Sequence, residues 1–209
     1  MLVVLLANAV LIQTDTYSAL PLAELKSRDD IDLAVVGSSI VGEHLNANLV
    51  SEQTGLTAFS ASVPSLSLQG EIALTREIYR KNSPVCTVLS LEPYNLNSAK
   101  EYTSAYYRLT PYLSSWRDKI TYYLDACRED GLYLDRLFMF REFGVESLSD
   151  ILKTVGLRLN PLKTYEKLKP TLDDTVTYEG SGFLRYDREP DVADLVREKL
   201  QREEMPDGY

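Results

Sequence analysis

Three short apolar runs in the first hundred residues alternate with segments whose apolar side chains recur at helical spacing. The runs are rich in valine, leucine and other residues typical of strands in a parallel sheet, and a glycine or proline ends each helical segment. Strand, helix, strand, helix, strand within about sixty residues is the pattern of right-handed βαβ units. The expected strands span 32–36, 56–61 and 85–91, and the expected helices span 45–54 and 68–81.

The second half of the chain follows a different pattern, with amphipathic helical segments and one stretch containing two glycines. We therefore predict an α/β fold: a three-layer parallel sheet of the flavodoxin type, with a core at 30–95 and a mostly helical insertion or cap at 96–209. Three strands are few for a doubly wound domain, so either the sheet is small or the chain ends before the fold is complete. The later helices are expected at 112–130, 145–155, 159–169 and 191–204, and a loop or hairpin at 175–187.

The chain begins with an uncharged apolar segment, residues 1–12. A spanning helix needs about 20 apolar residues, and a signal peptide has a basic start, so the segment meets neither condition as written. A buried first strand or helix, the end of a membrane anchor and a weak signal sequence all stay open. The polar stretch 13–18 resembles a linker behind an anchor, so we favour an anchor remnant at 1–13.

Composition narrows the chemistry that the chain can support. The 209 residues carry 31 acidic and 22 basic side chains, a net charge of −9, which argues against a nucleic-acid partner. One histidine excludes any site that needs two, and we expect neither a metal nor a cofactor. Two cysteines cannot form a disulfide framework. We interpret Cys86 and Cys127 as two buried free thiols rather than one bridge.

The strongest local motif is Val-Val-Gly-Ser-Ser-Ile-Val-Gly at 35–42, where the first strand turns into a helix. It differs from the dinucleotide-binding G-x-G-x-x-G by a serine, Ser39, in place of the middle glycine, and no acidic residue follows the second strand, so nucleotide binding is the weaker interpretation. Ser38 and Ser39 could be small turn residues that cap the helix. Alternatively, a serine at this edge of a parallel sheet could act as a nucleophile.

In its first hundred residues the sequence resembles the SGNH/GDSL hydrolase superfamily, in particular its membrane-anchored cell-envelope branch. The Gly-Ser-Ser turn matches the family's first block, which makes Ser39 the nucleophile with Ser38 as its neighbour. The family's second block would correspond to 60–65, where only its proline, Pro64, is retained; Ser65 would take the place of the glycine that supplies a backbone N–H to the oxyanion hole. Glu-Pro-Tyr-Asn at 92–95 occupies the third block, so Asn95 would be the second oxyanion donor.

The family's last block, Asp-x-x-His near the C-terminus, is absent, so the catalytic base is missing from this chain. His44 is the one histidine and follows Ser39 by five residues. On a helix that begins near Ile40, five residues correspond to about 500° of rotation, roughly 140° away from the serine's face. A general base must reach about 3 Å from the proton it removes, so His44 is a poor substitute.

The resemblance implies a serine acyl esterase or O-acyltransferase. Its partner would be an acylated cell-surface polysaccharide or a teichoic-acid-like polymer, with a membrane-bound acyltransferase as a further partner. It places the chain on the extracytoplasmic face of the membrane, anchored by its N-terminus; without an anchor the location would be cytoplasmic. Because the base is missing, a non-catalytic binding or assembly module of an envelope acylation system is the alternative.

Overall fold

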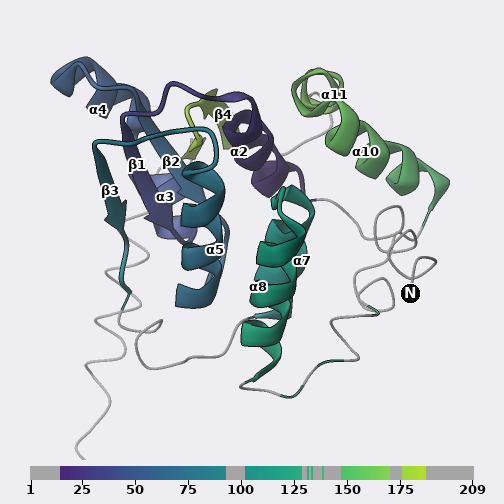
Figure 1. Ribbon diagram of the computed structural model, residues 1–209. Helices are drawn as coiled ribbons and strands as arrows, with labels where there is room; N and C mark the ends of the chain where they lie inside the picture. The colour runs from purple at the N-terminus through teal and green to yellow at the C-terminus, as the bar shows by residue number, and fades with distance from the viewer. Residues whose placement is uncertain are drawn as a thin grey trace, which may run out of the picture.

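The part of the chain that the computed structural model describes contains a three-stranded parallel sheet, seen on the left in Figure 1. The described residues are 15–92, 102–128, 131, 133, 138, 147–169 and 176–186. In chain order the elements are α2 Thr16–Ser27, β1 Leu33–Gly37, α3 Ser39–His44, α4 Ala47–Thr54, β2 Ala58–Ser62, α5 Leu68–Ile78, β3 Cys86–Leu89, α7 Thr103–Leu109, the 3₁₀ turn η1 Thr110–Tyr112, α8 Trp116–Arg128, α10 Leu148–Leu159, α11 Pro161–Leu168, β4 Val176–Gly180 and β5 Phe183–Tyr186.

The strand order of the parallel sheet is β2-β1-β3, with β1 in the middle. Leu33 of β1 is in register with Ala58 on one side and with Cys86 on the other, and both pairings are parallel. The three predicted strands and the mixed α/β class are therefore confirmed. The helix predicted at 45–54 forms as α4, and Gly55 ends it in the left-handed conformation, at φ 71°.

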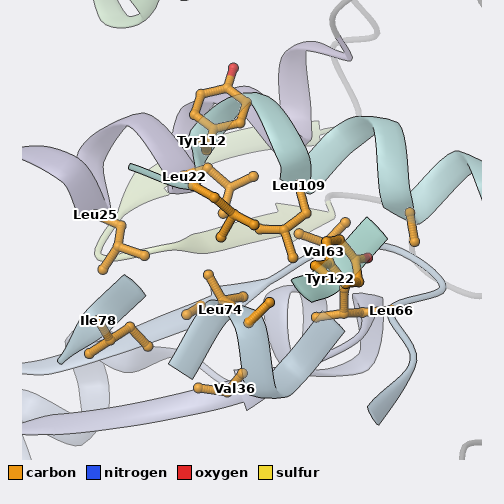
Figure 2. Close-up of a cluster of buried hydrophobic side chains, with 14 of the residues drawn as sticks. Leu22, Leu25, Val36, Val63, Leu66, Leu74, Ile78, Leu109, Tyr112 and Tyr122 are labelled. Atoms are coloured by element: carbon orange, nitrogen blue, oxygen red, sulfur yellow. The ribbon is translucent and has the colours of Figure 1, made fainter. Parts of the chain in front are cut away.

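Helices cover the two faces of this sheet. The chain passes from β1 to β2 through α3 and α4, and it crosses back to β3 through α5. Because such crossovers are right-handed, the two connections lie on opposite faces, as Figure 1 shows for α3 and α5. α2 lies on the α5 side, where Leu22, Leu25, Leu74 and Ile78 form the main core with Val36 of β1 (Figure 2).

Helix α2 is a correction to the expectation of a polar linker at 13–18. Asp15 caps the helix by accepting a hydrogen bond from the Tyr17 N–H at 3.3 Å. Leu22 and Leu25 are buried in the main core, so packing of this face outweighs the polar start of the segment. Pro21 lies inside the helix. The anchor remnant predicted at 1–13 lies outside the described residues.

The second half supplies further helices and a hairpin. α7, η1 and α8 add Leu109, Tyr112 and Tyr122 to the core (Figure 2), and α10 and α11 pack on α2. The hairpin expected at 175–187 is present as antiparallel β4 and β5, with Val176 opposite Tyr186. The helix predicted at 191–204 lies outside the described residues.

Both cysteines are free, but they lie in different surroundings. Cys127 is buried in α8, as predicted, whereas Cys86 is exposed on β3. The prediction of two buried thiols is therefore wrong for Cys86, because β3 is an edge strand that the other described elements leave largely exposed. In the described part of the chain, no helix has both the length and the apolar character needed to cross a bilayer.

Candidate functional site

The carboxyl ends of β1 and β3 lie side by side at the point where the strand order of the sheet reverses. From β1 the chain moves to β2 on one side, and it then returns to β3 on the other side. In open α/β sheets, ligands bind in the crevice outside the carboxyl ends of the strands at such a switch point. The Ser38–Ser39 turn directly follows β1, and Glu92 lies three residues after β3, so these residues surround the candidate site.

A hydrogen bond joins the two strand ends at this switch point. The Ser38 hydroxyl donates to the Glu92 carboxylate, linking the residue after β1 with the segment after β3. Ser38 is 4% exposed, and Glu92 is half-buried. Above the pair, the Ser90 N–H donates to the Val36 carbonyl at 2.9 Å and extends the pairing of the two strands. The site is thus held together from both strands.

Ser38 also begins the helix that follows it. Its side chain accepts a hydrogen bond from the Ile40 N–H at 3.3 Å and forms the N-cap of α3. The expectation that a serine of this turn caps the helix is confirmed for Ser38. Its hydroxyl therefore has two partners, one an acceptor and one a donor, which fixes its orientation.

The two glycines of the motif are explained by close packing. A Cβ at Gly37 would lie 2.6 Å from Val41 Cγ2 and 2.7 Å from Ser90 Cβ. A Cβ at Gly42 would lie 2.3 Å from Ser62 Oγ. All three distances are shorter than ordinary van der Waals contacts of about 3.5–4.0 Å, so the turn and α3 approach the strands only because these positions lack side chains. The spacing that resembles a dinucleotide motif thus has a packing reason.

Ser39 is the first residue of α3 and is half-buried. Within the described part of the chain, no side-chain hydrogen bond involves its hydroxyl. His44 is the last residue of the same short helix, and it is exposed. Because α3 begins at Ser39, the two side chains lie about 140° apart around the helix axis. His44 is therefore placed away from the serine, as the sequence predicts.

Ser65 lies in the turn between β2 and α5, at the same carboxyl edge of the sheet. It has a φ of 60°, in the left-handed region that favours glycine. The Leu66 N–H donates to the Val63 carbonyl at 3.1 Å and closes this turn. A serine thus adopts here a backbone conformation that glycine adopts more readily.

The structure brings three of the sequence-predicted site residues, Ser38, Ser39 and Ser65, to one edge of the sheet. The fourth, Asn95, lies outside the described residues. Sequence reasoning missed Glu92 as a site residue, although its position just after β3 was a usable signal. In the described part of the chain, no group of three or more His, Cys, Asp or Glu residues is arranged to hold a metal.

Comparison of the chain with family models, curated proteins and solved structures finds no match.

Proposed function

We propose that the switch point carries out serine-based acyl-ester hydrolysis or transfer on an acylated cell-envelope polymer, with Ser39 as the nucleophile. The hydrogen bond from Ser38 to Glu92 is the observation that supports this most directly. It fixes the turn that follows β1 against the segment that follows β3, at the place where α/β domains bind their ligands. Ser39 is the residue directly after Ser38. The resemblance of the first hundred residues to SGNH hydrolases gives the reaction class and the envelope substrate.

In the proposed reaction, Ser39 Oγ attacks the carbonyl carbon of an acyl ester. A bond forms between the serine oxygen and the acyl carbon, the ester C–O bond breaks, and the alcohol leaves with the proton that the serine gives up. The N–H of Ser65 and the side chain of Asn95 would stabilise the oxyanion. We assign Glu92 to accept and return the proton, because it is the described carboxylate that is hydrogen-bonded to this turn.

Covalent labelling with a fluorophosphonate tests the nucleophile. The serine oxygen displaces fluoride from phosphorus, so a reactive serine gains a stable phosphonyl group that peptide mass spectrometry can locate. We expect labelling at Ser39 and its loss in Ser39→Ala, while Ser149→Ala at an exposed site on α10 keeps it. Absence of labelling, or labelling that persists in Ser39→Ala, would contradict the assignment.

The assignment of Glu92 is tested separately. Loss of a general base reduces the rate by about 10²–10⁴-fold, so Glu92→Gln should reduce p-nitrophenyl acetate hydrolysis by that range. Glu52→Gln, at an exposed position on α4, is the matched control and should leave the rate unchanged. An unchanged rate in Glu92→Gln would exclude Glu92 as the base while leaving Ser39 in place.

One observation favours a second candidate, a non-catalytic module that binds an envelope polymer or an acyltransferase. The chain's one histidine, His44, lies at the exposed end of α3, turned about 140° away from Ser39, where it cannot serve that serine as a base. If fluorophosphonate does not react, a pull-down with an acylated teichoic-acid-type polymer decides between the proposals. A module would bind this polymer equally well with serine or alanine at position 39.

A further inference from the structure

The surface of the α10–α11 pair carries a row of exposed leucines. They are 72%, 67%, 81% and 53% exposed, respectively, and we call them the leucine stripe: Leu148, Leu152, Leu159 and Leu162. Isolated exposed apolar residues are common in proteins, whereas a contiguous set indicates an interaction site. In Figure 1 the two helices lie at the outer end of the helical layer, beyond α2.

The stripe is the outer face of an amphipathic pair of helices. At 100° per residue, Leu152 and Leu159 lie within about 40° of Leu148 around the α10 axis. Leu157 and Tyr165 are buried, and both helices pack on α2. Gly156 lets α11 approach α10, since a Cβ there would lie 2.9 Å from Thr164 Oγ1. The leucines are therefore held outward by the fold.

Positive charge accompanies the leucines. Residues 147–169 contain five lysine or arginine side chains against two carboxylates, a local balance of +3 in a chain whose net charge is −9. Lys163, Lys167 and Lys169 are exposed, and Lys153 is half-buried. None of these four lysines has an ion-pair partner among the described residues. Their charge is thus available to an external anionic surface.

We propose that the α10–α11 pair lies on the surface of an anionic lipid bilayer, with the leucine stripe at the boundary between headgroups and acyl chains. Amphipathic helices with leucine on one face and lysine around it bind in this way, through apolar burial and attraction to anionic headgroups. A bilayer requires no matching shape from the protein, so exposed leucines and lysines on one pair of helices are sufficient for this contact. This inference does not depend on the chemistry at Ser39.

Flotation of the full chain with vesicles tests the proposal. We expect binding to vesicles made of equal parts phosphatidylglycerol and phosphatidylcholine, and weaker binding to pure phosphatidylcholine. The double variant Leu152→Ser/Leu159→Ser should bind the anionic vesicles at least about tenfold more weakly, because it removes half of the stripe. Leu49→Ser, at a 48% exposed leucine on α4, is the matched control and should bind like the unmodified chain.

A second variant separates charge from apolar contact. Lys163→Glu/Lys167→Glu should weaken binding to the anionic vesicles by about tenfold or more, with little effect on phosphatidylcholine, because each cation near an anionic surface adds to the attraction. Arg76→Glu on α5 is the charge control and should have no effect. The changed side chains are exposed, so circular dichroism melting should show all variants folded.

Two results would overturn the proposal. If both double variants bind vesicles as well as the unmodified chain, another segment, such as the apolar residues 1–12, is responsible. If vesicles do not bind, and Leu152→Ser/Leu159→Ser converts an oligomer into a monomer in sedimentation, the stripe is an interface between copies of the chain.

Discussion

The two edge strands of the parallel sheet are buried to different extents, and the strand with the more polar sequence is the buried one. β2, with the sequence Ala-Phe-Ser-Ala-Ser, is buried along its whole length, whereas β3, with Cys-Thr-Val-Leu, is largely exposed. Both strands pair only with β1 in this sheet. We call the β2 side the closed edge and the β3 side the open edge. The burial of an edge strand is therefore determined by the elements that pack over it and not by its own composition.

The closed edge is covered by the turn of the β4–β5 hairpin. The Ser60 N–H, which would face solvent on a bare edge, donates to the Ser181 carbonyl at 2.9 Å. The Ser60 hydroxyl donates to the Leu45 carbonyl at 3.0 Å. Buried polar groups are tolerated when their hydrogen bonds are satisfied, which is why a serine-containing strand can lie inside the molecule.

The hairpin is attached to the rest of the molecule by a half-buried polar cluster around Glu24 of α2. The Tyr178 hydroxyl donates to one carboxylate oxygen of Glu24, and the Ser181 N–H donates to the other at 3.2 Å. The Gly182 N–H donates to the Tyr178 hydroxyl at 3.3 Å. The open edge has a smaller counterpart, a 2.9 Å hydrogen bond between the exposed hydroxyls of Tyr79 and Thr87.

The largest expected effect comes from adding a side chain where the hairpin backbone closely approaches β2 at the closed edge. A Cβ at Gly182 would lie 1.8 Å from the Ser60 carbonyl oxygen, at a φ of 78°. Because backbone must move to relieve this contact, Gly182→Ala should lower the free energy of unfolding by about 3 kcal/mol in urea titrations. Gly180→Ala in the same hairpin, at φ 88° with open space around it, should cost only about 1–2 kcal/mol. Equal losses of unfolding free energy in the two variants would show that the hairpin backbone is not in close contact with β2 in solution.

The next largest effect tests the polar cluster. Tyr178→Phe removes the hydroxyl that bonds Glu24 and the Gly182 N–H, and it should lower the free energy of unfolding by about 1–3 kcal/mol. Tyr79→Phe makes the same change at the open edge, where solvent replaces the lost bond, and it should cost less than about 0.5 kcal/mol. A similar cost at both tyrosines would remove the energetic distinction between the edges.

The same tyrosine predicts an alkaline limit to stability. Burial, and then the neighbouring Glu24 carboxylate, raise the pKa of Tyr178 above its usual value of 10. The unfolded chain therefore loses this proton first as the pH rises. The stability that the protonated Tyr178 hydroxyl contributes is thus complete below about pH 10 and is lost as the pH rises further. Chemical unfolding between pH 8 and about 11 should show a steeper loss for the unmodified chain than for Tyr178→Phe. Parallel curves would contradict this.

Sequence reasoning succeeded where local signals and packing agree. The valines of β1 and the stop at Gly55 predicted the strand and the end of α4. It failed where distant segments decide the outcome. Leu22 and Leu25 make α2 a core helix despite its polar start. Cys86 is exposed because the described elements leave the edge strand β3 largely uncovered.

The candidate site shows the same division. The turn at Ser38 and Ser39 follows from a strand that ends in glycine, and the capping role of Ser38 follows from residue type. Glu92 lies 54 residues further along the chain from Ser38, and only the strand order β2-β1-β3 brings the ends of β1 and β3 together. The contact between Ser38 and Glu92 therefore could not be predicted from the spacing of residues in the sequence alone.

The smallest expected effect lies at the open edge itself. Val88 of β3 is 46% exposed, whereas Val36 of β1 is fully buried. Val→Thr adds a hydroxyl at nearly constant volume, which costs about 1–3 kcal/mol where the group is desolvated without a partner and less than about 0.5 kcal/mol at a surface position. Urea unfolding of Val88→Thr should therefore be indistinguishable from that of the unmodified chain, with Val36→Thr as the buried control. A loss above about 1 kcal/mol at Val88 that grows with protein concentration would mean that another copy covers β3 in solution, because unpaired strand edges are templates for association. In that case both edges would be closed, one by the chain's own hairpin and the other by a neighbouring molecule.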